Sequence, residues 1–261
     1  MIKFFRNIRQ SLLSEGKITK YFKYAIGEIA LVMIGILLAL QVSNWNEKRI
    51  NNTKELTYLR GIQSDLKSQI TSLESIEKVY DSLIKSAGSL LVDFQNLQHL
   101  DKIPNFNKRI SFLMWDTGSI EMNTSFTELI STGNIRLIKN ENLKNRIIRF
   151  YQYSELTAKR TLSNTEKVFY RTAFPVITDV AIINPSDFNM QVKDLTQYNI
   201  SKNLVQEQLK QLKNPSIQKK IINAISLKIL ATTTNRNSTL SIIRFGKNLS
   251  EEITTEIQRI Q

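Results

Sequence analysis

Residues 24–42 read YAIGEIALVMIGILLALQV, and no other stretch of the chain constrains its structure so strongly. Between Ala25 and Leu40 the only polar side chain is that of Glu28. A helix over these residues is about 28 Å long, close to the roughly 30 Å thickness of the hydrocarbon core of a bilayer. A helix buried in a water-soluble protein is rarely apolar on every face for about four turns. The stretch therefore predicts a transmembrane helix over residues 24–43.

Aromatic and basic side chains flank this stretch. Aromatic rings of this kind concentrate at the headgroup level of a membrane, and we expect four interfacial anchors. These anchors are Tyr21, Phe22, Tyr24 and Trp45. Residues 1–23 carry six basic side chains against one acidic side chain, whereas residues 41–60 carry four basic ones. The excess predicts a single-pass protein of the bacterial inner membrane, with a cytoplasmic N-terminus and a periplasmic C-terminal domain.

Residues 1–23 precede the span as a basic arm. Its apolar residues alternate with basic ones at helical spacing. The pattern predicts an amphipathic helix on the cytoplasmic leaflet, and a disordered basic tail is the alternative. The arm is too long for the charged region of a cleaved signal peptide, and the apolar run exceeds the usual 7–15 residues. A retained signal anchor is therefore favoured.

Two parts of the sequence carry a resemblance. The first is the opening, MIKFFRNIRQSLLS from Met1 and KYFKYAIGEIALVMIGILLALQVSNWNEKR from Lys20, and the second is SFTELISTGNIRLIKN from Ser125 to Asn140. Both resemble a family of single-span membrane proteins from Bacteroidota, the domain-of-unknown-function family 6090. The resemblance implies inner-membrane residence and a helical exterior. It brings no activity, ligand or catalytic residue to this chain.

A long amphipathic helix is predicted over residues 48–98. Apolar residues occupy nine of ten positions that alternate by three and four, and Gln69 fills the tenth. The apolar positions are Leu59, Ile62, Leu66, Leu73, Ile76, Tyr80, Leu83, Ala87 and Leu90. The flanking positions lack a regular charge code, so a helical bundle is favoured over a two-stranded coiled coil.

The remaining sequence predicts more helices and almost no strand. The further predicted helices cover residues 123–132, 141–173, 203–213 and, as a last pair, 217–260. Pro175 is expected to end or kink the second of these. Residues 176–183 are the single strand candidate, with a helix as the alternative, and Phe112 and Trp115 are expected in the core. The predicted class is all-α, with one transmembrane helix followed by an extracytoplasmic helical domain over residues 44–261.

Glu28 is the main candidate for a functional side chain. An ionisable group inside a span is costly, and it shares a helical face with Val32, Gly35 and Ala39. Gly35 and Ala39 form a small-x-x-x-small pair that lets two helices approach closely. This face predicts a helix–helix contact in the membrane, or a proton-linked site. The alternative is that Glu28, one turn inside the span, extends to the interface and pairs with a nearby lysine.

The composition argues against most chemistry. The 261 residues contain no Cys and one His, His99, so Cys-ligated metals, Cys nucleophiles and His-rich metal sites are excluded. Asp116-Thr117-Gly118 is similar to the active-site triplet of aspartic proteases, but those enzymes need two carboxylates on a β-rich scaffold. The net charge of +13 reflects either selection or the lysine-rich composition of the genome, and no nucleic-acid-binding motif accompanies it. We expect no enzyme activity, cofactor, metal or nucleic-acid partner.

The sequence thus predicts a membrane-anchored helical module of the cell envelope that binds itself or another envelope membrane protein. The bilayer is its first expected partner. The alternative is an extracytoplasmic ligand sensor that signals through a partner protein.

Overall fold

The computed structural model describes residues 18–118, 120–184 and 200–261. Within these ranges the chain is helical and contains no strand, which confirms the predicted all-α class. Residues 176–183 form no strand: the first three end a helix at Thr178, as the helical alternative predicts in part, and the others are a turn and irregular chain. The prediction for the arm at residues 1–17 lies outside the described residues, and so do the side chains of Tyr21 and Tyr24. The chain divides into two units, Met1–Thr57 and Tyr58–Gln261.

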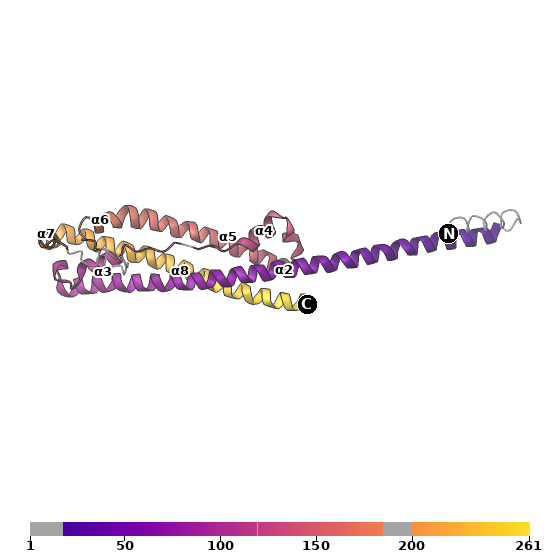
Figure 1. Cartoon of the computed structure of the whole chain (residues 1–261), viewed down its shortest axis with the longest axis horizontal. Coiled ribbons are helices and arrows are strands. Elements are labelled where there is room, and N and C mark those ends of the chain that lie inside the picture. Colours follow the sequence, from indigo (N-terminus) through magenta and orange to yellow (C-terminus); the bar gives the residue numbers. More distant parts are fainter. Residues whose placement is uncertain (1–17, 119, 185–199) are drawn as a thin grey trace. The chain divides into compact units, whose positions relative to one another are not determined.

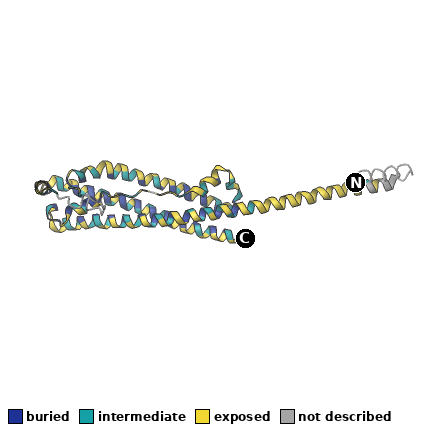
Figure 2. Cartoon of the chain, viewed as in Figure 1, coloured by how far each residue is buried: buried dark blue, intermediate teal, exposed yellow. Residues whose placement is uncertain are grey.

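Helix α2 (Ile18–Leu97) begins in the first unit and continues into the second without interruption. Among the described residues it is the one helix long and apolar enough to cross a membrane, and none of its apolar window is buried. Figure 2 shows this part of α2 as exposed along nearly its whole length, and Ala25 and Glu28 are the partly covered residues among those described. In water so continuous an apolar surface is unfavourable, since each buried Å² of apolar area stabilises a protein by about 25 cal/mol.

The second unit is built from long helical rods that lie side by side (Figure 1). One is the part of α2 from Tyr58 onward. The second consists of α5 (Glu141–Ser163), the π-helical segment η3 (Asn164–Ala173) and α6 (Phe174–Thr178). The third is α8 (Pro215–Ile260). The shorter elements are η1 (Leu100–Lys102), α3 (Phe106–Phe112), α4 (Thr124–Ser131), η2 (Asn134–Leu137) and α7 (Lys202–Leu212).

The apolar stripe predicted on α2 is buried at every one of its ten positions, including Gln69. Its buried residues are divided between two apolar cores. The first core contains Leu59, Leu66 and Phe150 among others, and the second contains Leu90, Phe169 and Ile225. The stripe folds inward because residues three and four apart lie on the same face of a helix.

Three predictions about the remaining elements need correction. The predicted last pair of helices is a single helix, α8, and no proline interrupts it after Pro215. Gly246 lies within this helix and packs against the side chains of Ile70 and Phe150. Phe112 and Trp115 are exposed, and Leu113 is buried in their place. Their stretch has no helical period, so the sequence did not indicate which side chains face inward.

Candidate functional site

The predicted membrane-contact residues lie together on one face of α2, as their spacing of four, three and four requires. Val32 is exposed, and a Cβ atom added at Gly35 would meet no atom within 4 Å. Phe22 and Trp45 are also exposed, and the guanidinium of Arg49 lies 5.9 Å from the centre of the Trp45 ring. Glu28, Val32, Gly35 and Ala39 therefore present a surface to a lipid or to another helix. Their predicted roles stay predictions.

Along α5 and α8, buried polar side chains lie between the two apolar cores of the second unit, and Gln69 of α2 faces them from among residues of the first core. We call these side chains the polar layer, and α2, α5 and α8 supply it. Its members are Gln69, Ser154, Thr157, Thr161, Lys228, Thr232, Asn235 and Thr239. They occupy the inward stripes of α5 and α8, where the neighbouring turns carry Phe150, Ile225 and Ile242. This layer is the largest departure of the second unit from an apolar core.

Hydrogen bonds across the polar layer tie the three rods together. The Gln69 side-chain amide donates to Ser154 Oγ at 2.8 Å, and the Asn164 amide donates to Asn235 Oδ1 at 3.0 Å. Gln69 Oε1 is buried with no hydrogen-bond partner. A cavity of about 10 Å³ lies beside Ser154, bordered by Thr157, Thr161 and Thr239. The cavity has room for about one water molecule, which can form hydrogen bonds with the hydroxyl groups that border it.

Lys228 is the most unusual member of the layer. Its side chain is buried, and the residue is only 2% exposed. The ammonium donates a hydrogen bond to the backbone oxygen of Trp115 at 2.8 Å and lies 3.7 Å from the centre of the Phe169 ring. Both contacts favour the charged form, because a carbonyl and the face of an aromatic ring are electron-rich. Burial nevertheless lowers the pKa of Lys228 to about 8, and the charge of Asp116 only partly opposes this.

The contact of Lys228 with Trp115 holds an irregular segment in place. Residues 115–118 and 120–123, which we call the strap, connect α3 to α4 along the rods (Figure 1). The Tyr80 hydroxyl donates to the backbone oxygen of Thr117 at 3.4 Å, and Gly118 lines the hydroxyl-bordered cavity. Burial raises the pKa of Tyr80, so this hydroxyl keeps its proton. The strap thus lies over the polar layer, which it meets at Lys228 and at the cavity beside Gly118.

Replacing Lys228 tests the burial of its charge. The folded protein binds this proton less tightly than the unfolded chain, so the free energy of unfolding should rise with pH above about 8, by on the order of 3 kcal/mol in full. We expect urea titrations of the wild type at pH 7.5 and 9.5 to show about 2 kcal/mol of this rise and Lys228→Met to lack it. The window stops at pH 9.5 because Tyr80 and Tyr151, with raised pKa values, destabilise the fold above their usual pKa of 10. Equal pH dependence of both proteins would contradict a buried ammonium.

The segment Ser125 to Asn140, singled out in the sequence, packs on the rods at the end of the second unit opposite α7 (Figure 1). The backbone N–H of Ser125 donates to Asp65 Oδ2 of α2 at 2.7 Å, so Asp65 caps α4, and the side chain of Asn123 at the N-cap position makes no capping hydrogen bond. The amide of Asn134 donates to the Tyr58 hydroxyl at 2.9 Å. Gly133 has φ +69°, the left-handed conformation expected after a helix end.

Gly61 permits this docking. A Cβ atom there would lie 2.7 Å from Ser125 Oγ and 3.1 Å from Ser125 Cβ, whereas at Gly88 of the same helix it would meet nothing within 4 Å. We expect Gly88→Ala to stabilise the protein by about 0.5–1 kcal/mol through helix propensity. Gly61→Ala should be less favourable than this control by about 1–3 kcal/mol, because α4 must shift. Urea unfolding of both variants measures the difference, and equal values would contradict the close approach.

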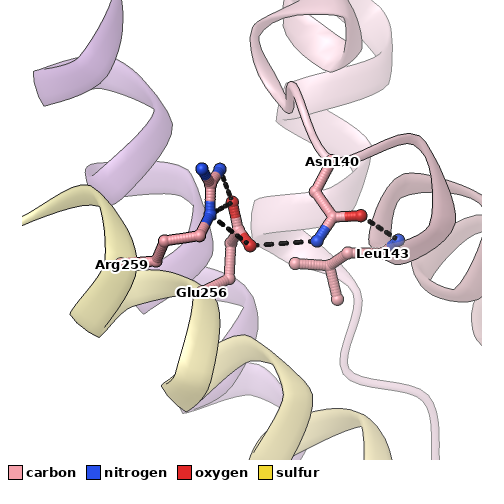
Figure 3. A network of polar contacts seen from close by, with 4 residues as sticks. All are labelled: Asn140, Leu143, Glu256 and Arg259. Atoms are coloured by element: carbon pink, nitrogen blue, oxygen red, sulfur yellow. Dashed lines mark hydrogen bonds and ion pairs between the residues drawn. The ribbon is translucent and has the colours of Figure 1, made fainter.

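A polar network joins the end of this segment to the end of α8 (Figure 3). Asn140 Oδ1 accepts from the backbone N–H of Leu143 at 3.1 Å, which caps α5, and its amide donates to Glu256 Oε2 at 2.9 Å. Arg259 donates to the same carboxylate, and its hydrogen bonds are the largest cause of the lowered pKa of Glu256. The polar atoms of this network contact one another, so it holds the bundle together and offers no open site.

The residues weighed for catalysis are not brought together. The half-exposed His99 lies 3.7 Å from Asp101, measured from Nδ1 to Oδ1. Asp116 accepts a hydrogen bond from the backbone N–H of Thr117 at 2.9 Å. In the described part of the chain no three His, Asp or Glu side chains converge as metal ligands would. Sequence reasoning missed the polar layer, although the inward stripes of α5 and α8 continue through it at unbroken spacing.

Comparison with known proteins identifies the family. Residues 28–170 match the model of a family of unknown function, DUF6090, and this match covers more than half of the chain. It includes the apolar stretch of α2 from Glu28 onward, the α4–η2 segment and all of α5. No curated protein and no solved structure matches. The chain therefore belongs to the DUF6090 family.

Proposed function

We propose that the protein is a single-span inner-membrane protein of a bacterium of the Bacteroidota whose helical exterior is a non-catalytic interaction module. Residues 24–43 cross the membrane, residues 1–23 lie in the cytoplasm, and residues 44–261 lie in the periplasm. The bundle binds a second copy of the chain or another envelope membrane protein.

One observation carries this proposal: the apolar part of α2 is exposed on all sides. Large apolar side chains such as Ile29, Met33 and Leu37 have more than half of their surface uncovered. Soluble monomers rarely expose continuous apolar surface of this extent, and hydrocarbon is the medium that covers a helix on every face. The excess of basic residues before the span supports the cytoplasmic placement of the N-terminus.

A second candidate function, a ligand sensor, is favoured by the polar layer. Hydroxyl groups, a buried ammonium and π-helical turns interrupt the packed core at mid-length. Segments of π-helix and buried polar groups often mark places where helices shift. A sensor would act by rearranging the strap over this layer, and would need a partner to carry the signal.

Oligomeric state in detergent separates the two functions. The full chain, purified in mild detergent, is expected to be a dimer or larger by light scattering at micromolar concentration. A monomer whose melting temperature rises with a periplasmic extract would favour the sensor. A monomer that neither cross-links in membranes nor responds to such extracts would overturn both.

The predicted face on α2 gives a sharper test, because the chain contains no natural cysteine. If Glu28, Val32, Gly35 and Ala39 line a helix–helix contact, Val32→Cys should form a disulfide-linked dimer in oxidised membranes. Ile34→Cys, about 200° away around the helix, should not. Adding Glu28→Gln should reduce the cross-linked fraction several-fold, since a polar contact is lost. Equal cross-linking at both positions would contradict a defined face.

A further inference from the structure

Lysines gather at the end of the second unit where α7 meets the start of α8. Within residues 200–220 the chain carries five lysines and a single acid, Glu207. All five lysines are exposed. We call them the basic tip: Lys202, Lys210, Lys213, Lys219 and Lys220. In Figure 1 the α7 label marks this end, opposite the end that carries α4.

The basic tip differs from the rest of the unit in how its charges are paired. Elsewhere basic side chains meet carboxylates at short distance: Arg146–Glu252 at 2.7 Å, and Arg236–Glu77 and Lys247–Glu74 at 2.6 Å. At the tip, within the described residues, Lys210 has a carboxylate partner, Glu207, at 3.8 Å, and the other four lysines have none within 4.0 Å. A lysine-rich composition explains many lysines, but it does not explain why carboxylate partners are so few among the described residues of the tip.

Neighbouring elements extend the positive surface. The α3 helix packs on α7, since the Asn107 amide donates to Gln208 Oε1 at 2.9 Å, and η1 contacts α7 as well. Lys102 of η1 and Lys108 of α3 are both exposed. The cations therefore come from four elements that converge on one end of the bundle. Arranged around an end, they suit an extended anionic surface better than a single small anion.

An exposed leucine of α7 lies beside these lysines. Gln208 and Leu212 turn the inner face of α7 toward the bundle, and Leu209 is 39% exposed. Leu209 lies within about 40° of Lys202 and Lys213 around the helix, whereas the exposed Leu204 lies on the opposite side, next to Glu207. Lysines beside an exposed leucine on one helix are typical of helices that lie at a lipid interface, where headgroups bind the cations and the acyl boundary covers the leucine. A soluble polyanion would bind the lysines and leave the leucine in water.

We propose that the basic tip docks on a membrane surface rich in anionic phospholipid, with Leu209 inserted at the acyl boundary. The chain then holds two lipid contacts, one through α2 and one through the tip. This inference rests on the proposed function only in that the second unit must be outside the membrane that α2 crosses.

The test uses the full chain in nanodiscs of neutral phosphatidylcholine, so that α2 is already occupied. The nanodiscs are mixed with vesicles of phosphatidylcholine alone or with 30% phosphatidylglycerol, and flotation measures the bound fraction. We expect binding to the anionic vesicles only, weakened at least tenfold between 50 and 300 mM salt. Lys213→Glu/Lys219→Glu/Lys220→Glu should abolish it.

The control variant Lys67→Glu/Lys78→Glu/Arg244→Glu changes the net charge equally at exposed sites away from the tip, and it should still float. Circular dichroism of every variant should match the wild type. Leu209→Ser should weaken binding several-fold at constant charge. The inference is overturned if the control also loses binding, or if Leu209→Ser binds normally while soluble polyphosphate competes, since the occupant is then a soluble polyanion.

Failure of the proposed function gives a different result. If α2 does not cross membranes, the protein is missing from the purified nanodiscs. If only the inference fails, the nanodiscs contain the protein but do not float with anionic vesicles.

Discussion

Placing two lysines in the apolar part of α2, as Ile34→Lys/Leu37→Lys, should remove the protein from the membrane. Both positions lie near the middle of residues 24–43, where each exchange of an aliphatic residue for lysine costs about 3–4 kcal/mol of insertion free energy. The pair therefore costs about 6–8 kcal/mol, more than a single helix of this length tolerates. Flotation of cell membranes after carbonate washing measures the fraction retained, and we expect it to fall from nearly all to a few per cent.

A matched control separates this effect from general damage. Val92→Lys/Leu230→Lys introduces the same charges at exposed aliphatic residues of the second unit. This variant should float with the membranes as the wild type does. If the α2 variant also stays in the carbonate-washed membranes, the apolar stretch is not the anchor.

The largest effect on folding is expected from Phe150→Ala. This ring is fully buried in the first core, with edge-to-face contacts to Tyr151 at 5.2 Å and Phe245 at 5.5 Å between ring centres. Removing it leaves a cavity among large side chains, which costs about 3–5 kcal/mol of unfolding free energy. Urea unfolding of the full chain in detergent, followed by circular dichroism, measures the loss.

Leu162→Ala is the control for this variant. Leu162 lies on the same helix, α5, but is mostly exposed, so its truncation should change the unfolding free energy by no more than about 0.5 kcal/mol. Equal losses for both variants would mean that α5 does not pack with the face that carries Phe150.

The regular parts of the fold could be predicted from the sequence because a single physical rule places them. On α2, apolar residues at alternating spacings of three and four all lie on one face of the helix. Burying them therefore decides which face of the helix turns inward. The α5 helix was predicted at the right place, yet its apolar residues Leu156 and Leu162 are exposed. Ser154, Thr157 and Thr161 take the buried positions, because the period of the stripe decides the face even where its residues are polar.

The same reason explains what was missed in the candidate site. On α8 the inward stripe runs from Ile225 through Lys228 and Asn235 to Ile242 at helical spacing. A search for apolar residues stops at Lys228, although a search for the period would have continued through it. Its contact with Trp115 could not be predicted, because the strap has no period and only the tertiary structure places it.

The topology of the chain in living cells can be measured with single cysteines. Because the sequence contains no natural cysteine, Gln95→Cys in the second unit and Ser11→Cys in the arm each provide one reactive thiol. An impermeant maleimide added to intact spheroplasts should label Gln95→Cys, and should label Ser11→Cys only after the membrane is permeabilised. Protection of both thiols, or labelling of both in intact spheroplasts, would contradict a chain that crosses the inner membrane once with its bundle outside.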